Sequence, residues 1–166
     1  MQDNLLVVYT DGSVLRPVEG TSPGGWAYGY SAGGKMRVFS GGALNVTNNQ
    51  MEILASIKAM QRFERLERFD LKLEFVSDSQ YHVNGANDWM HTWVRKNWGG
   101  FGNTKIKNAE YWKELYRLHC LFDCKWRWVR GHNGHAQNEI MDKAAKQAAR
   151  RALFHEKLRE DRLNLV

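Results

Sequence analysis

The first half of the chain is patterned mainly as β-strands. Residues 5–10, Leu-Leu-Val-Val-Tyr-Thr, form a short and nearly continuous apolar run, which is typical of a strand covered on both faces. Two further strand-like runs, residues 26–31 and 36–40, flank Gly33 and Gly34, so we expect a hairpin that turns at these glycines. The pattern therefore predicts three strands, antiparallel to one another, at the start of the domain.

The second half of the chain alternates helices with strands. Apolar residues at helical spacing begin at Met51 and predict a helix that runs to about Phe69, with Asn48 or Asn49 as its N-cap. Further helices are predicted over residues 79–98, with an interruption near Gly85, over residues 109–121, and from residue 138 to the C-terminus. The fourth and fifth strands are predicted at residues 71–77 and 125–129, where apolar and polar residues alternate.

This order of elements indicates an α/β fold with a mixed five-stranded sheet and helices on its faces. The chain of 166 residues is long enough for one domain with its own core, and it shows no internal repeat or linker. No run approaches the roughly 20 apolar residues of a membrane span, and the N-terminus lacks the pattern of a signal peptide. We therefore expect a soluble, cytoplasmic protein, and we expect it to be a monomer.

The charge balance favours a polyanionic partner. Lys and Arg number 24 against 18 Asp and Glu, which gives a formal net charge of +6. Seven tryptophans in a chain of this length suggest stacking surfaces as well as core positions. Cys120 and Cys124 are too few for a disulfide framework. Together with His119 they would allow a metal clip, but we favour the interpretation that they pack as small apolar side chains.

Four acidic residues lie at the ends of predicted elements. Asp11 and Asp78 directly follow the first and fourth predicted strands, and they face each other if these strands are parallel neighbours. Glu52 and Asp142 lie in the first turns of two helices and can point to the same place. Taken singly, each acid is also compatible with a turn, a cap or an exposed helix position. A cluster of carboxylates, however, repels itself unless cations neutralise it, and such oxygen ligands suit Mg²⁺ or Mn²⁺.

Four segments of the chain resemble the type 1 ribonuclease H family, in the family order and up to about residue 150. They read Thr-Asp-Gly-Ser at 10–13, Thr-Asn-Asn-Gln-Met-Glu at 47–52, Ser-Asp-Ser-Gln-Tyr at 77–81, and Gly-His-Asn-Gly-His at 131–135 followed by Asn138, Glu139 and Asp142. The resemblance implies a ribonuclease H-like fold, with a catalytic domain over residues 1–150 and a helical extension of the same domain over residues 151–166. It also implies an endonuclease that hydrolyses the RNA strand of RNA–DNA hybrids and leaves 3′-hydroxyl and 5′-phosphate ends.

The resemblance assigns the catalytic groups by motif position. Asp11, Glu52, Asp78 and Asp142 match the four acids that bind two Mg²⁺ ions, for which Mn²⁺ can substitute, and the scissile phosphate. His132 matches the family's mobile-loop histidine, which assists proton movement or product release.

Residues that contact the hybrid follow from the same resemblance. Asn48, Asn49 and Gln80 match positions that reach into the minor groove, where amides pair with base edges and with 2′-hydroxyls. Trp89 and Trp93 match an aromatic pair that packs along the DNA strand. Because a spacing of four residues also suits a buried helical stripe, we expect Trp89 in the groove and Trp93 in the core.

Other contacts concern the phosphate backbone. Thr47 and Asn108 match positions that hold a DNA phosphate. The chain departs from the family pattern nearby, since Asn45 replaces an expected basic residue and the loop over residues 14–21 is longer than usual. Four further basic residues could form a basic protrusion or belong to an ordinary solvated surface. They are Arg95, Lys96, Lys105 and Lys107.

Two other functions fit parts of this pattern. An integrase-like or junction-resolving nuclease also needs clustered acids, but usually lacks the sequence contexts around Asn48 and Gln80. A non-catalytic module that only binds hybrids is disfavoured by the retention of all four acids. Cleavage of hybrid compared with duplex DNA separates the first alternative from a ribonuclease H.

Overall fold

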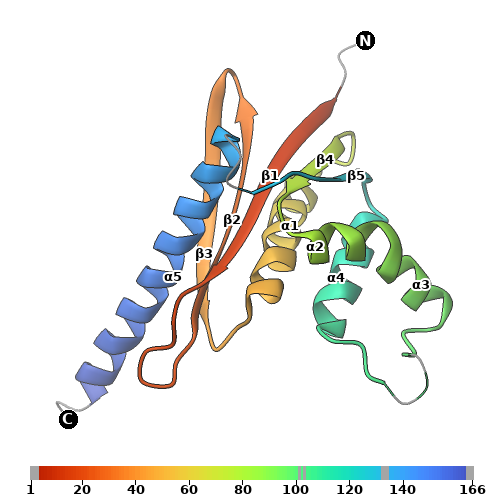
Figure 1. The fold of residues 1–166 in the computed structure, drawn as a ribbon. Helices are drawn as coiled ribbons and strands as arrows, with labels where there is room; N and C mark the ends of the chain where they lie inside the picture. The colour runs from red at the N-terminus through yellow and green to blue at the C-terminus, as the bar shows by residue number, and fades with distance from the viewer. Residues whose placement is uncertain (1–3, 101, 103, 132–134, 164–166) are drawn as a thin grey trace.

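Five strands form one mixed sheet in the order β3-β2-β1-β4-β5 (Figure 1). The computed structural model describes residues 4–100, 102, 104–131 and 135–163. Strands β1, β2 and β3 are antiparallel, β4 runs parallel to β1, and β5 runs parallel to β4. The predicted sheet of three antiparallel and two parallel strands is confirmed. The strands span β1 (Leu5–Val14), β2 (Pro23–Ala32), β3 (Lys35–Leu44), β4 (Lys72–Ser77) and β5 (Asp123–Trp128).

The first strand is longer than its apolar run. β1 continues through Asp11, which pairs with Ala27 of β2, and the antiparallel ladder ends only where Val14 faces Gly24. The prediction that Asp11 follows the strand directly is therefore wrong. The strand extends through Asp11 because it pairs with β2, which supplies hydrogen-bonding partners. The residues Asp11, Gly12 and Ser13 have low strand propensity of their own.

Helices connect the strands and cover the sheet. They are α1 (Asn48–Arg65), α2 (Gln80–Asn84), the π-helical turn η1 (Gly85–Trp89), α3 (Met90–Arg95), α4 (Ala109–His119) and α5 (Ala136–Leu163). The predicted interruption near Gly85 is a widened turn rather than a gap, since α2, η1 and α3 follow one another directly. Gly85 is required there because a β-carbon would collide with the indole ring of Trp112.

The start of α1 is fixed by Thr47, and the prediction of Asn48 or Asn49 as its N-cap is wrong. The backbone N–H of Gln50 donates to the Thr47 hydroxyl, and the backbone N–H of Thr47 donates to the Gln50 side chain at 2.9 Å. This reciprocal pair is a capping box. The helix ends at Arg65, before the predicted Phe69.

Helices α1 and α5 lie on opposite faces of the sheet (Figure 1). Neighbouring glycines of β2 show this, since a β-carbon on Gly24 would meet Met51 of α1, and one on Gly25 would meet Ala145 of α5. The larger core lies on the α1 face, where side chains with at most 1% exposure include Val8, Ile53, Met60, Phe75, Trp112 and Leu115. A smaller core of Ala27, Met141 and Ala145 seals α5 against the other face.

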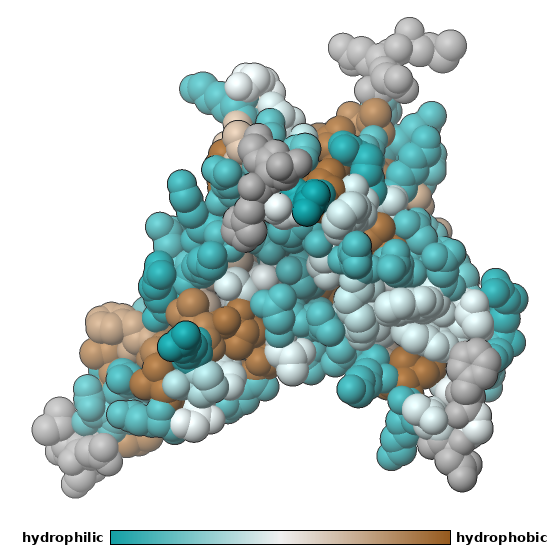
Figure 2. All heavy atoms as spheres, viewed as in Figure 1, coloured by the Kyte–Doolittle hydropathy of each residue, from teal (hydrophilic) through white to brown (hydrophobic). Residues whose placement is uncertain are grey.

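The last turns of α5 run beyond the sheet. Figure 2 shows apolar side chains over the C-terminal half of this helix, where Phe154 and Leu158 are exposed. Within the described ranges, no helix is both long and apolar enough to cross a membrane.

Candidate active site

Strands β1 and β4 separate where their acidic residues lie. The parallel ladder ends at the pair Tyr9 and Val76, two residues before Asp11 and Asp78 respectively. Asp78 directly follows β4, as predicted. Beyond this point β1 stays with β2, so an opening forms at the carboxyl ends of β1 and β4.

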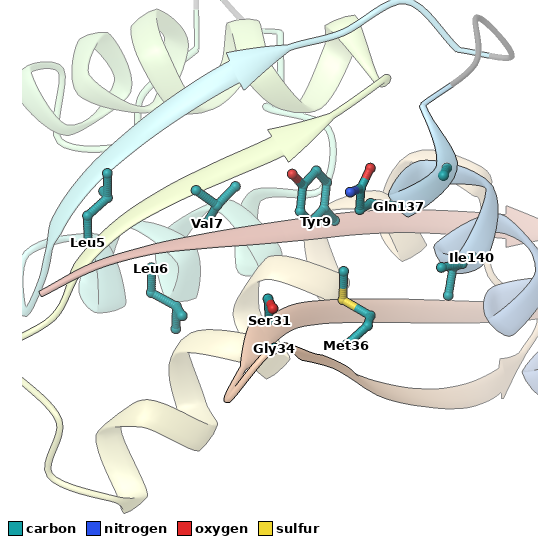
Figure 3. Close-up of a pocket in the computed structure, with 10 residues that line it drawn as sticks. Leu5, Leu6, Val7, Tyr9, Ser31, Gly34, Met36, Gln137 and Ile140 are labelled. Carbon is teal, nitrogen blue, oxygen red and sulfur yellow. The ribbon is translucent and has the colours of Figure 1, made fainter.

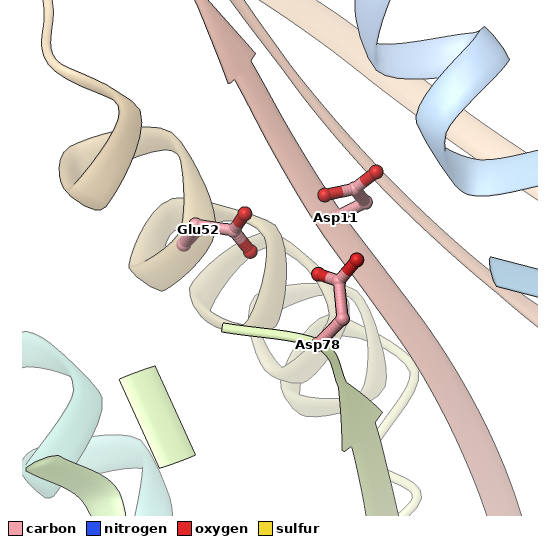
Figure 4. A group of neighbouring side chains, drawn as sticks. All are labelled: Asp11, Glu52 and Asp78. Carbon is pink, nitrogen blue, oxygen red and sulfur yellow. The ribbon is translucent and has the colours of Figure 1, made fainter. Parts of the chain in front are cut away.

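Three carboxylates meet at this opening. Asp11 comes from β1, Asp78 follows β4, and Glu52 comes from the second turn of α1; Figure 4 shows them pointing toward one another. Each offers an oxygen, and the three oxygens lie within 4.8 Å of one another. The structure thus brings together three of the four acids predicted from the sequence.

Gly12 allows α1 to approach β1 closely enough for this contact. A β-carbon at position 12 would collide with the backbone nitrogen of Glu52 and with the backbone of Met51. The Gly12 N–H also donates a 2.8 Å hydrogen bond to Asp11 Oδ1. Gly12 therefore orients the Asp11 carboxylate through its N–H. Because it has no side chain, it also lets α1, which carries Glu52, pack closely against β1.

The acids sit in an environment that disfavours their charged forms. Asp11 is 6% exposed and Glu52 is 4% exposed. Burial, then the neighbouring Asp78 and Asp142 carboxylates, raise the pKa of Asp11 to about 7. Burial, followed by the charges of Asp11 and Asp78, raises the pKa of Glu52 well above its usual range. Since Glu52 Oε2 is buried without a hydrogen-bond partner, a divalent cation among these oxygens would satisfy the site, and the donor set suits Mg²⁺ or Mn²⁺.

Asp142 approaches from the other face of the sheet, on α5. Its charge contributes to the raised pKa of Asp11, so it lies near the cluster, but it is not within the group of three. Its Oδ2 accepts a hydrogen bond of 2.8 Å from Lys146 Nζ. With Asp78, Asn138 and Glu139 it lines a small recess of about 20 Å³.

His132 lies outside the described residues. The residue before it, Gly131, lies against Asp78, since a β-carbon there would be 2.7 Å from Asp78 Oδ2. The segment that carries His132 therefore starts beside the acidic cluster.

Comparisons with known proteins agree with this geometry. The family profile described as RNase H matches residues 3–150. The chain belongs to the ribonuclease H family. It is 38% identical over 149 residues to a ribonuclease H of Nitrosomonas eutropha, covering 88% of this chain and 90% of that protein. It is 36% identical over 146 residues to a ribonuclease H of Hahella chejuensis, covering 88% and 94% of the two chains. This protein is thus an enzyme of a nuclease family, and a hydrolase.

Solved structures show the same fold. A type 1 RNase H with the type 2 active-site motif superposes with a TM-score of 0.74 at 30% identity, covering 90% of this chain and 74% of that one. A foamy viral protease-reverse transcriptase, solved in complex with RNA/DNA hybrid, gives a TM-score of 0.73 over 87% of this chain and 20% of its own. At 19% identity the second likeness shows the ribonuclease H fold alone.

The amides assigned to the minor groove are exposed and lie close to the acids in the sequence. Asn48 and Asn49 are exposed in the first turn of α1, one turn before Glu52. Gln80 is exposed two residues after Asp78. All three side chains are therefore accessible, and each lies within four residues of an acid along the chain.

The two residues assigned to a phosphate belong to a wider network. Asn108 has a left-handed backbone (φ 58°), and its side chain accepts from Gln50 Nε2 at 3.3 Å and donates to the Tyr81 hydroxyl at 3.2 Å. Tyr81 also accepts from the indole N–H of Trp112. Through Gln50 the network reaches Thr47. The sequence analysis missed Gln50 and Tyr81 as members, although both lie within the matched motifs.

The two tryptophans differ in exposure. Trp89 is 37% exposed and packs edge-on against Tyr81, with ring centroids 5.5 Å apart. Trp93 is half-buried and packs against Trp112 in the core. The four basic residues of the expected protrusion, Arg95, Lys96, Lys105 and Lys107, are exposed.

Among the described residues, neither the cysteines nor the pocket beside α5 forms a group of metal ligands. The cysteines form no disulfide with each other. Cys124 lies 3.9 Å from the sulfur of Met60, as expected for packing, whereas Cys120 is exposed, so the predicted apolar packing is wrong for Cys120. In the part of the chain that the structure describes, the group of three acids is the one that could hold a metal. A pocket of about 560 Å³ beside the first residues of α5 has no carboxylate in its lining; it is lined by Leu5, Leu6, Val7, Tyr9, Ser31, Gly34, Met36, Ala136, Gln137 and Ile140 (Figure 3).

Proposed function

We propose that this protein is an endoribonuclease that hydrolyses the RNA strand of RNA–DNA hybrids and leaves 3′-hydroxyl and 5′-phosphate ends. One observation carries the proposal: in a chain of the ribonuclease H family, Asp11, Glu52 and Asp78 converge to within 4.8 Å at the opening between β1 and β4. We further propose that it acts as a cytoplasmic monomer, with a catalytic domain over residues 1–150 and a helical extension of it over residues 151–166.

Divalent cations would be held by Asp11, Glu52 and Asp78, with Asp142 completing the set. We expect two Mg²⁺ ions, with Mn²⁺ as a substitute. Bound in this way, two ions supply activation of a water molecule and stabilisation of the leaving oxygen of a phosphodiester. The buried Glu52 oxygen without a partner supports this fit, because an anionic oxygen in such a place requires a compensating positive charge.

The side chains around the acids hold the substrate. Asn48, Asn49 and Gln80 would pair with base edges and 2′-hydroxyls in the minor groove, which marks the cut strand as RNA. Trp89 would pack along the DNA strand with its exposed face. Because 2′-hydroxyls are absent from duplex DNA, these amide contacts favour the hybrid.

The remaining groups position the backbone and move protons. Thr47 and Asn108 would hold a phosphate of the DNA strand, and their shared network with Gln50 and Tyr81 fixes them before substrate arrives. His132 would assist proton transfer or product release.

A cleavage assay tests the proposal. Labelled hybrid, duplex DNA and duplex RNA of one sequence are incubated with the protein in Mg²⁺, in Mn²⁺ and in excess chelator, and the product ends are identified. We expect metal-dependent cutting of the RNA strand of the hybrid, with much slower cutting of both duplexes. Equal initial rates on hybrid and duplex DNA would identify a different nuclease, and cutting in chelator would exclude the proposed role of the acids.

A further inference from the structure

The basic residues of α5 are concentrated directly after Asp142. Between positions 143 and 155 the helix carries four Lys or Arg residues and no Asp or Glu: Lys143, Lys146, Arg150 and Arg151. In the turns that follow, acidic and basic residues are mixed, and Arg159 is paired with Glu156. The middle of α5 is therefore a positively charged segment that begins beside an acid of the proposed active site.

Three basic residues of the helix lie in one row with Asp142. Lys146, Arg150 and Lys157 follow it by four, eight and fifteen residues, and these spacings place all four on one side of an α-helix. At a rise of 1.5 Å per residue, Arg150 lies about 12 Å and Lys157 about 22 Å beyond Asp142 along the helix axis. The row therefore leads from the acids along α5 and past the end of the sheet (Figure 1).

Close packing fixes the direction in which this row points. A β-carbon on Gly42 of β3 would collide with the backbone of α5, so helix and strand are in direct contact there. On the same flank Arg151 donates a 3.1 Å hydrogen bond to the hydroxyl of Ser40 on β3. On the other flank Asp142 contributes to the raised pKa of Asp11 in β1. The row thus lies on the β1 side of α5, and the helix cannot roll without breaking these contacts.

Two members of the row keep their charges available to a partner. Arg150 and Lys157 are exposed, and neither takes part in any of the ion pairs among the described residues. Lys146 differs from them, because it is paired with Asp142. Lys157 lies outside residues 3–150, which match the family profile, so no family assignment covers it. Two uncompensated cations on a rigid helix suit a partner with regularly spaced negative charges.

We propose that Arg150 and Lys157 form a phosphate-binding track that holds the duplex arm on one side of the scissile bond. The proposal rests on the function proposed above and extends the substrate contact of that site along α5. Since each strand of a duplex rises by about 3.4 Å per nucleotide, the two residues would reach phosphates about four and about seven nucleotides from the cut. Carboxylates repel phosphates, so a cationic track beside them supplies the attraction that brings the substrate to the site.

The test varies the two duplex arms separately. A short RNA segment of about four nucleotides, flanked by DNA in the same strand, fixes the cut site, and each arm is made about 3 or about 12 base pairs long. The variant is Arg150→Gln/Lys157→Gln. The control, Lys35→Gln/Arg37→Gln, removes the same charge from exposed residues of β3 that take part in none of the ion pairs among the described residues.

We expect lengthening of one arm to lower the KM of the wild type more than lengthening of the other. The Gln variant should lose this one-sided gain, with a KM about five- to tenfold higher on the substrate with that long arm and an unchanged kcat, whereas the control should keep it. Arg150→Lys/Lys157→Arg, which preserves both charges, should behave as the wild type. Binding to an all-DNA duplex should also weaken in the Gln variant, and the slope of log Kd against log salt concentration should fall by about one to two.

Other outcomes overturn the track. These are an arm preference that survives in the Gln variant, an equal loss in the control, or an equal loss on short-armed and long-armed substrates, which would indicate general attraction. Circular dichroism checks folding, and the two single Gln substitutions replace the double variant if it is unfolded. Metal-dependent cutting of hybrid together with a wild-type salt slope in the Gln variant contradicts only the track. A reduced salt slope in the variant, together with no cutting of hybrid by the wild type, contradicts only the proposed function.

Discussion

The indole N–H of Trp128 donates a 2.9 Å hydrogen bond to the backbone carbonyl oxygen of Asp78. Trp128 is the last residue of β5, and Asp78 directly follows β4, so the bond ties the ends of two parallel strands together. It fixes the backbone from which one of the three converging carboxylates projects. Trp128 was not among the residues that the sequence analysis selected.

Trp128→Phe should lower the cleavage rate without unfolding the protein. The variant keeps most of the ring but loses the donor, and a hydrogen bond of this kind is worth about 0.5–1.5 kcal/mol, or roughly a two- to tenfold change in kcat. Steady-state cleavage of hybrid measures it, with Trp26→Phe on β2 as the control, since Trp26 lies on a strand that carries none of the acids. A rate equal to that of the control would show that Asp78 needs no such support.

Gly12→Ala should remove most activity. Its β-carbon would collide with the backbone of Glu52 and push α1 away from β1, at a cost of about 1–3 kcal/mol in stability. Gly29→Ala is a matched control, because its β-carbon would meet the side chain of Met141 and the backbone oxygen of Arg37 rather than the backbone of α1. Both variants should lose stability in chemical denaturation, but only Gly12→Ala should lose more than tenfold in cleavage rate under conditions where both are folded. Comparable activity in the two would contradict the proposed packing role.

Asp78→Asn should abolish cleavage and stabilise the metal-free protein at neutral pH. The pKa of Asp11 in the folded state is about 7, above its usual value of 3.8, so folding is favoured when Asp11 is protonated. The free energy of unfolding therefore falls as pH rises from about 4 to 7. Without the charge of Asp78, the free energy of unfolding should fall less as pH rises. We expect the variant to be more stable than the wild type by about 1 kcal/mol at pH 8 in chelator, and little more stable at pH 4. Urea denaturation at both pH values checks this, and equal stability at pH 8 would contradict it.

His82 should make the fold sensitive to acid. It is fully buried, both ring nitrogens lack partners, and burial lowers its pKa to about 3. Since this folded value lies below the usual 6.5, protonation favours the unfolded chain as pH falls through that interval. The stability of the wild type relative to His82→Phe should therefore fall by about 1.4 kcal/mol per pH unit below pH 6.5. Taking the difference between the two proteins cancels the opposite contribution of Asp11, and a difference independent of pH would contradict the assignment.

Gln50→Arg should strengthen hybrid binding. Gln50 joins Thr47 to Asn108 without supplying a charge, and Asn45 replaces the basic residue expected nearby. An arginine at position 50 would add a bidentate phosphate donor, so we expect a several-fold lower Kd at low salt and a steeper salt dependence. Gln147→Arg, at an exposed position on α5, adds the same charge elsewhere. Equal effects of the two substitutions would indicate general electrostatic attraction.

The sequence predicts the topology of the sheet and the convergence of three of the acids, because strand patterns and the positions of the acids near element ends are local features. Asp78 was correctly placed at the end of β4, and Gly33 and Gly34 form the predicted hairpin turn, with φ values of 59° and 74°. The extension of β1 through Asp11 was not predictable from its own residues, because it depends on pairing with β2. The same holds for the bond from Trp128, which depends on the register between β4 and β5.

Other features depend on contacts between segments far apart in the chain. The role of Gly12 becomes visible only when α1 lies on β1. The capping preference for Thr47 over its asparagine neighbours is local, and the Thr-x-x-Gln spacing to Gln50 is a signal that could have identified it from the sequence.

The two helices that carry acids lie on opposite faces of the sheet and have separate cores, so no single layer of the protein contains the whole site. Glu52 lies on the helix that packs against the large aromatic core, and Asp142 lies on the helix that packs through the smaller core of Ala27, Met141 and Ala145. Sliding one layer against the sheet by even part of a residue would separate carboxylates whose spacing must match a metal ion. The distances between the carboxylates therefore depend on how the two helices are docked on the sheet. If α5 docked out of register, cleavage activity would be lost before any secondary structure was lost.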